Sequence, residues 1–230
     1  MSFDSSKARA DILQRIRSAQ KRGAPSAGDH AAADDYLAHH PAGPRPAPYA
    51  DRLAHFKAMA ERMASTVETV DAMSDAPAAA ARYLATQGIA SRAVAWPLLQ
   101  ALPWEAASIA VEFRPPQRDE SQGADMVGIT GCFCAIAETG TLVLLSGVDS
   151  PASTHLLPET HIAIVAASRV VAAMEDAFEL MRREHGGAQQ MMPRAVNMVS
   201  GPSRTGDIEQ TIVLGAHGPY RVHIIVAASA

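Results

Sequence analysis

The chain has 230 residues, of which 48% are hydrophobic and 5% aromatic, with 20 Lys and Arg against 24 Asp and Glu for a formal net charge of -4. This apolar content suffices for a sizeable core. The weakly acidic balance and the scarce aromatic residues argue against nucleic acid or an anionic lipid surface as the main partner, because neither a positive field nor a stacking surface is present.

The hydropathy pattern predicts no membrane segment. No uncharged apolar run approaches the roughly 18 residues that a bilayer span needs, and the N-terminus lacks the apolar core of a signal peptide. We therefore expect a cytoplasmic protein. The two cysteines, Cys132 and Cys134, are spaced too tightly on a predicted strand for an easy disulfide, so we expect reduced thiols.

The N-terminal segment, residues 1–22, predicts an amphipathic helix. Ile12, Leu13 and Ile16 fall on one face at helical spacing, and basic residues surround them. We expect this helix to dock on the body of the protein or on a partner.

Residues 23–50 follow as a Pro/Ala-rich linker, in which closely spaced prolines favour neither helix nor strand. His30, His39 and His40 are interpreted as exposed loop residues, because no cysteine or carboxylate pair accompanies them at metal-ligand spacing.

Residues 51–230 are predicted to form one α/β domain, because helical patterns alternate with short apolar runs. Helices are predicted at 51–70, 78–86, 168–183 and from 207 to 214. Strands are predicted at 93–96, 108–113, 133–137, 142–145, 161–165, 195–199 and 221–226. The alternation predicts a three-layer architecture in which a mostly parallel sheet carries helices on both faces.

The turn between the strands at 133–137 and 142–145 is the first candidate site. The sequence Glu138-Thr139-Gly140-Thr141 predicts a hairpin turn in which Gly140 adopts a positive φ. Glu138 is the candidate nucleophile or base, and Thr139, Gly140 and Thr141 are candidate ligand-binding residues. The alternative is that Glu138 only caps the hairpin.

The segment 200–209 is the second candidate site. A strand that ends in Ser-Gly-Pro-Ser-Arg-Thr and leads into a helix would direct backbone N–H groups, hydroxyls and a guanidinium at an anion. The candidate ligand-binding residues are Ser200, Gly201, Ser203, Arg204, Thr205 and Asp207. Asp207 and Ile208 stand where a P-loop has its Lys and Ser/Thr, so a small carboxylate suits this segment better than a nucleotide triphosphate. A purely structural turn is the alternative.

Two further polar stretches complete the prediction. The loop 149–161, which contains His155 and His161, is expected to help form a crevice beyond the carboxyl ends of the strands. His217 is either a ligand-binding residue or a partner for the end of the preceding helix. Cys132, Cys134 and His155 offer an incomplete zinc set, so no metal site is predicted.

Five separated motifs resemble those of the LUD-domain family, in its lactate utilisation branch. They are Gly-Ile-Thr-Gly at 128–131, Ala-Ile-Ala-Glu-Thr-Gly-Thr at 135–141, Leu-Leu-Pro with His-Ile-Ala at 156–163, Ser-Gly-Pro-Ser-Arg-Thr with Asp-Ile-Glu at 200–209, and Gly-x-His-Gly-Pro at 215–219. The resemblance implies a fold akin to phosphosugar isomerases and CoA transferases, with residues 51–230 as the LUD domain.

The resemblance also implies a role in the oxidation of L-lactate to pyruvate beside two iron–sulfur partner proteins. This chain lacks a ferredoxin-like cysteine set, so no cofactor is expected in it and the clusters are expected in the partners. We expect a non-redox component in which Arg204 holds a small carboxylate. The alternatives are a free-standing CoA-transferase-like or sugar-phosphate enzyme that uses Glu138, and an assembly or regulatory module without a ligand.

Overall fold

The computed structural model describes residues 6–21, 23–39, 41, 43–45, 47–119, 123–186, 193–206 and 212–229. The chain divides into two compact units, Met1–Arg45 and Pro46–Ala230, which are described separately. Within the described ranges, no helix is both long enough and apolar enough to cross a membrane.

The first unit contains two helices, α1 (Ser6–Gln20) and α2 (Ala27–His39). Helix α1 agrees with the helix predicted from the Ile12 and Ile16 spacing. Helix α2 shows that the prediction of neither helix nor strand after residue 23 is wrong for 27–39. The helix breakers lie on either side of this alanine-rich stretch, and Ser26 and Asp29 cap its start, with Asp29 Oδ2 accepting from Ser26 N at 2.8 Å.

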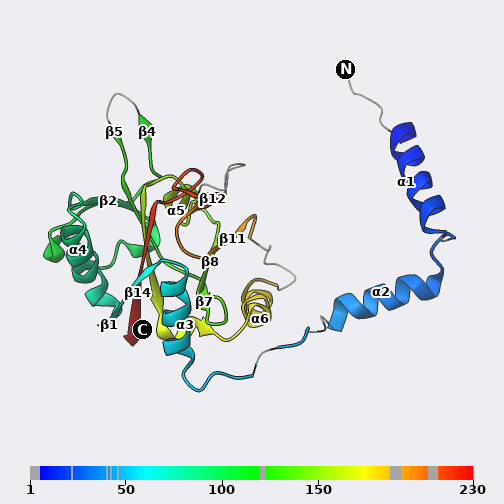
Figure 1. The fold of residues 1–230 in the computed structure, drawn as a ribbon, viewed down its shortest axis with the longest axis horizontal. Coiled ribbons are helices and arrows are strands. Elements are labelled where there is room, and N and C mark those ends of the chain that lie inside the picture. The colour runs from blue at the N-terminus through cyan, green and yellow to red at the C-terminus, as the bar shows by residue number, and fades with distance from the viewer. Residues whose placement is uncertain are drawn as a thin grey trace. The chain divides into compact units, whose positions relative to one another are not determined.

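The second unit is built around a six-stranded parallel sheet (Figure 1). The strand order is β1 (Thr66–Ala72), β14 (Arg221–Ser229), β9 (Thr160–Ala166), β6 (Val127–Thr130), β2 (Arg92–Ala95) and β3 (Ala110–Glu112). Every neighbouring pair is parallel. The predicted α/β class with a mostly parallel sheet is therefore confirmed.

Helix α4 (Ala76–Thr86) covers one face of this sheet, and its Tyr83 ring stacks on His223 with centroids 3.9 Å apart. The other face packs against α3 (Arg52–Arg62) and a second sheet, in the order β10 (Val170–Val171), β7 (Cys134–Ile136), β8 (Thr141–Leu145) and β11 (Val196–Val199). Helix α6 (Met174–His185) backs the second sheet, on the side of Figure 1 away from α4.

The alternating direction of side chains along the strands of the second sheet produces these layers. Ala135, Leu142 and Leu144 point into the main core, whereas Ile136 and Val143 pack with α6 in a smaller cluster. Side chains alternate between the two faces of a strand, so a run of apolar residues buries both faces. The predicted hairpin is confirmed, since β7 and β8 pair antiparallel and Gly140 has φ 66°.

Short elements complete the unit. They are the 3-10 turns η1 (Met73–Asp75), η2 (Pro97–Leu99), η3 (Glu105–Ala107) and η4 (Ala167–Arg169), the one-turn helix α5 (Ser153–Leu156), and two antiparallel ribbons, β4 (Arg118–Asp119) with β5 (Gly123–Ala124) and β12 (Arg204–Gly206) with β13 (Ile212–Leu214).

The predicted helix 51–70 is wrong beyond residue 62. Helix α3 ends there, Ala64 has a left-handed φ of 65°, and β1 begins at Thr66. Val67 and Val70 continue the helical spacing by coincidence, but the β-branched Thr-Val-Glu-Thr-Val run forms a strand beside β14.

The predicted helix 168–183 begins too early, because Ser168 lies in η4 and α6 starts only at Met174. Asp176 caps that start by accepting a hydrogen bond from Ala173 N at 3.0 Å. The predicted helix from 207 to 214 is also wrong where the structure describes it. Ile212–Leu214 is a strand, paired with Arg204–Gly206.

Candidate functional site

The two predicted sites meet through a chain of hydroxyl groups. Thr139 Oγ1 lies 2.7 Å from Thr141 Oγ1, which in turn lies 2.7 Å from Ser200 Oγ. Thr141 is buried and Ser200 is exposed. Residues that are far apart in the sequence are thus joined at one corner of the fold, and its hydroxyl groups run from the interior to solvent.

Both turns rest on the C-terminal end of α3, and each does so through a glycine. A Cβ atom on Gly140 would lie 2.3 Å from Ala60 N, and one on Gly201 would lie 2.0 Å from Met63 O. Both glycines also have positive φ angles, 66° and 80°. Only glycine therefore satisfies both the backbone conformation and the close approach.

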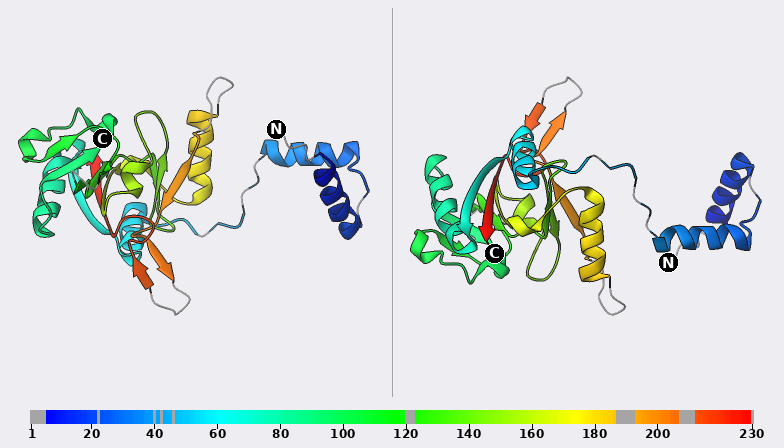
Figure 2. Two further views of the ribbon diagram at one scale, coloured as in Figure 1. Left: turned by 90° about the horizontal axis from the view of Figure 1, so that it is seen from above. Right: turned by 90° about the horizontal axis from the view of Figure 1, so that it is seen from below.

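Arg204 reaches the same end of α3, where its Nη2 donates a long hydrogen bond of 3.4 Å to Met63 O. The side chain is exposed, and Figure 2 shows the β12–β13 ribbon beside α3. Thr205 pairs with Val213 in this ribbon. Arg204 and Thr205 lie in a strand, so the described residues of this segment do not show the helix N-terminus on which the predicted anion site relied.

The remaining predicted residues lie around this ribbon or next to α3. Ser203 N donates to Pro219 O at 2.9 Å, and exposed His217 lies in the turn that precedes Pro219. Because the element before that turn is a strand, His217 has no helix end to cap. Asp207 lies outside the described residues.

Glu138 is half-buried, and its backbone N donates to Ala172 O at 3.0 Å. Within the part of the chain that the structure describes, neither a hydrogen bond nor an ion pair joins its carboxylate to Arg204. The structure therefore brings together Thr139, Thr141 and Ser200, but shows no contact between the acidic and basic members of the predicted crevice.

The hydroxyl corner lies toward the amino ends of the parallel strands, since Met63 directly precedes β1. The loop 149–161 likewise leads into the amino end of β9, so the prediction that it lies beyond the carboxyl ends is wrong. In open α/β sheets, ligands bind beyond the carboxyl ends of the strands. A ligand site at that edge must therefore come from other residues.

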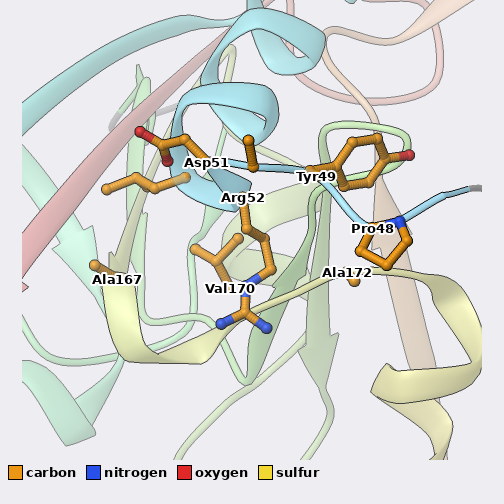
Figure 3. Close-up of a pocket in the computed structure, with 9 residues that line it drawn as sticks. Pro48, Tyr49, Asp51, Arg52, Ala167, Val170 and Ala172 are labelled. Carbon is orange, nitrogen blue, oxygen red and sulfur yellow. The ribbon is translucent and has the colours of Figure 1, made fainter.

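A hollow of about 530 Å³ lies beyond the carboxyl end of β9 (Figure 3). It is formed by residues 48–53, at the start of α3, and by Ala167, Val170 and Ala172. Its volume lies in the usual range for small-ligand sites. Ala172 is also the residue whose carbonyl receives Glu138 N, so the hairpin turn adjoins this hollow.

Arg52 is the cation of the hollow. Figure 3 shows its side chain extending away from the carboxylate of Asp51. Asp51 Oδ1 instead accepts from Ala54 N at 2.9 Å as the N-cap of α3. Arg52 is exposed and forms no ion pair with any residue that the structure describes. Its guanidinium is the positive group of the hollow, since the carboxylate of Asp51 already caps the N-terminal end of α3.

The wall beside Arg52 is aromatic and apolar. The Tyr49 ring stacks on His55 with centroids 3.8 Å apart and planes 12° apart, and Leu53 packs against the core. The sequence patterns did not single out Arg52 or Tyr49. The available signal was Asp51, whose type and position mark the start of a helix and hence the positive end of its dipole.

His155 and His161 form a buried pair between the two sheets, with ring centroids 5.8 Å apart. His161 Nε2 lies 2.8 Å from Thr130 Oγ1, while both nitrogens of His155 lack a hydrogen-bond partner among the described residues. Burial lowers the pKa of His155 to about 4, although nearby Asn197 opposes this shift. Burial and the neighbouring His155 lower the pKa of His161 to about 3. Both imidazoles are therefore neutral near pH 7.

The cysteines are free thiols without the features of reactive ones. Cys132 Sγ donates to Cys134 O at 2.8 Å. Burial raises the pKa of both thiols, that of Cys134 to about 12, which leaves little thiolate near pH 7. In the described ranges, no three His, Cys, Asp or Glu side chains are placed to hold a metal ion.

The central parallel sheet, the second sheet and the hollow at the carboxyl edge define an α/β protein with a candidate small-ligand site. A family model described as the LUD domain matches residues 53–227. The chain belongs to the LUD domain family, which confirms the resemblance predicted from the five motifs.

Curated relatives include the Lactate utilization protein C of Anoxybacillus flavithermus, Bacillus subtilis and Geobacillus kaustophilus, which are 34%, 39% and 40% identical to this chain. The matches cover 47%, 44% and 44% of this chain and 48%, 42% and 41% of the relatives. The matched region thus spans less than half the length of each of these relatives.

A crystal structure of a DUF162 family protein from Deinococcus radiodurans has the same fold, with a TM-score of 0.55 and 22% sequence identity. The match covers 80% of this chain and 100% of that one. At this identity the likeness concerns the fold.

Proposed function

We propose that this chain serves lactate utilisation as a component without a redox centre of its own. In this role it supports the oxidation of L-lactate to pyruvate, and iron–sulfur partner proteins accept the two electrons. The named relatives support this proposal. The cysteine content also supports it, since the two cysteines of the chain are fewer than the four thiolates that a ferredoxin-type cluster takes.

The ligand proposed for this component is a small carboxylate, held in the hollow at the start of α3. The observation that carries this assignment is the guanidinium of Arg52, which has no ion-pair partner among the described residues and lies in a hollow at the carboxyl edge of the parallel sheet. A guanidinium binds a carboxylate through two parallel charge-assisted hydrogen bonds.

The apolar part of such a ligand would contact the aromatic and apolar wall of the hollow. Val170, Ala172 and Leu53 offer methyl and methylene groups there, next to the Tyr49 ring. Small-ligand sites commonly combine a mainly apolar lining with a few polar groups that fix the orientation. A 2-hydroxy or 2-oxo acid with a short alkyl group fits this division of the hollow.

A genetic experiment tests the proposal in the native host. A strain that lacks this gene is supplied with the wild-type chain, with Arg52→Ala, or with Arg62→Ala, and growth is measured on L-lactate and on pyruvate. Arg62 is an exposed arginine in the last turn of the same helix and provides the matched control. We expect wild type and Arg62→Ala to restore growth on L-lactate and Arg52→Ala to fail, while all strains grow on pyruvate.

Two outcomes would contradict the proposal at different levels. If the deletion strain grows normally on L-lactate, the chain has no role in lactate oxidation. If Arg52→Ala restores growth as well as wild type does, the role stands but the ligand assignment is wrong. Immunoblotting confirms that each variant accumulates to the wild-type level.

A further inference from the structure

The two helices of the first unit bury none of their side chains. Neither α1 nor α2 contains a buried residue, and Ile12 and Ile16 are 56% and 46% exposed, while Tyr36 and Leu37 are 65% and 63% exposed. Helices of 15 and 13 residues are marginal in water without a packing partner. The apolar and charged residues on the surface of each helix therefore indicate what kind of partner covers it.

Helix α1 presents an apolar stripe between two arginines. Ile12, Ile16 and Ala19 line a shallow hollow of about 450 Å³ together with Arg15. With 3.6 residues per turn, Arg9 lies about 60° to one side of Ile12 and Arg15 about 60° to the other. Four basic residues and one aspartate give this helix a net charge of +3.

Helix α2 has the opposite charge in the same arrangement. Its stripe contains Ala33 and Leu37, with Asp34 about 60° to one side of Leu37 and Asp29 about 80° to the other. Three aspartates give this helix a net charge of -3 when its histidines are neutral. Asp29 also caps the helix through Ser26, but its carboxylate keeps its charge, and its pKa is lowered by that hydrogen bond.

We propose that these two faces bind one another between two copies of this chain, so that α1 of each copy packs antiparallel on α2 of the other. In this arrangement Arg9 and Arg15 flank the Leu37 stripe, while Asp29 and Asp34 flank the stripe of Ile12 and Ile16. Each ion pair at the rim of such a contact contributes little affinity by itself. Its main effect is on partner choice, because a pairing of α1 with α1 or of α2 with α2 would bring equal charges together.

A second copy suits the two faces better than other occupants. A two-fold pair of chains forms the α1–α2 contact twice and leaves neither stripe uncovered, as a closed symmetric dimer requires. Within one chain, α2 leaves the α1 stripe open, as the exposure of Ile12 and Ile16 shows. The four helices would then form an antiparallel bundle of the kind built on short connections.

The oligomeric state of the full chain tests this proposal. Size-exclusion chromatography with light scattering, at moderate ionic strength, is expected to give twice the mass of one chain. The double variant Arg9→Glu/Arg15→Glu is expected to halve that mass. The double variant Lys7→Glu/Arg17→Glu makes the same change of charge on the far side of α1 and is expected to leave the mass unchanged.

Mixing two charge variants tests whether complementary charges restore the dimer. Asp34→Arg alone is expected to weaken the dimer, and a mixture of that variant with Arg9→Glu/Arg15→Glu is expected to recover the doubled mass. A wild-type mass of one chain would overturn the proposal. It would also fail if Arg9→Glu/Arg15→Glu kept the doubled mass, or if the far-side variant dissociated equally.

Discussion

Gly140 and Gly88 share a left-handed backbone but differ in their surroundings. Their φ angles are 66° and 65°. A Cβ atom on Gly140 would collide with the backbone of Ala60 in α3, whereas one on Gly88 would meet no atom within 4 Å. Substituting alanine at both positions therefore separates the energetic cost of a left-handed backbone from the cost of a steric collision with α3.

We expect Gly88→Ala to lower the free energy of unfolding by about 1 kcal/mol, the cost of a left-handed alanine. Gly140→Ala should lower it by about 3 kcal/mol or more, because α3 must also move. Urea denaturation of both variants measures the difference. Equal losses would show that the contact between the hairpin turn and α3 is looser than described.

The buried histidines predict an acid-sensitive fold. His155 and His161 stay neutral in the folded protein, with pKa values of about 4 and about 3, but take up protons near pH 6.5 when the chain unfolds. Since the unfolded chain binds more protons below that pH, acid favours unfolding. Each histidine should reduce the free energy of unfolding by about 1.4 kcal/mol per pH unit, as pH falls from 6.5 toward the folded pKa.

Urea denaturation at several pH values between 7 and 5 measures this slope. His155→Gln removes one titrating group and should reduce the slope, whereas His217→Gln, at an exposed position in the turn before Pro219, should leave it unchanged. An unfolding free energy that does not change between pH 7 and pH 5 would contradict the burial of both imidazoles.

At the scale of single residues, local backbone requirements were easier to predict from the sequence than burial. The Glu-Thr-Gly-Thr pattern predicts the turn and the positive φ of Gly140, because both depend on neighbouring residues. The loop containing His155 and His161 was predicted as a polar loop that helps form a crevice, and the burial of both imidazoles was not predicted. Their burial depends on how β11 and α5 cover the main sheet, which local patterns do not encode.

At the scale of elements, the chain of hydroxyl groups links the β7–β8 turn to the segment that follows β11. Thr141 is its middle member, with hydroxyl contacts to Thr139 and Ser200. Thr141 lies at the start of β8, so its side chain connects the beginning of this strand to the residue that follows β11. The hydroxyl corner is therefore a structural link whether or not a ligand uses it.

We expect Thr141→Val to lower the free energy of unfolding by about 1–2 kcal/mol, because a buried hydroxyl and both its contacts are lost. Thr86→Val is a suitable control. Thr86 lies exposed on α4 and donates only to Arg82 O in its own helix, so its loss should cost below about 0.5 kcal/mol. Chemical denaturation compares the two, and equal losses would argue against the proposed link.

Element prediction succeeded where the local pattern and the tertiary context agree. Helix α4 and the strands β2, β9 and β14 lie close to their predicted positions. It failed at Ile212–Leu214, which was predicted as the end of a helix but forms a strand paired with Arg204–Gly206. Helical spacing gives no information about the pairing of β12 with β13.

At the scale of the whole molecule, the sequence identified the α/β class and the family, but the residues predicted as ligand-binding do not line the hollow at the carboxyl edge of the sheet. The predicted motifs cluster at the C-terminal end of α3, whereas the hollow lies at its N-terminal end, about 16 Å away for an 11-residue helix. Which strand ends share an edge depends on strand order and direction, and these follow from tertiary structure.

The proposed role also predicts the behaviour of Glu138. Because this component is proposed to bind a carboxylate without chemistry of its own, Glu138→Gln should still restore growth on L-lactate in the deletion strain. Loss of growth, with an unchanged circular dichroism spectrum and melting temperature, would instead indicate that this carboxylate takes part in a reaction.

The most direct test of the central claim is the binding of L-lactate to the purified full chain, measured by isothermal titration calorimetry near pH 7. We predict saturable binding by the wild type, unchanged affinity for Arg62→Ala, and affinity weaker by about tenfold or more for Arg52→Ala, the loss expected for a charge-assisted pair. Wild-type affinity in Arg52→Ala, or no binding of L-lactate or pyruvate by the wild type, would contradict the account.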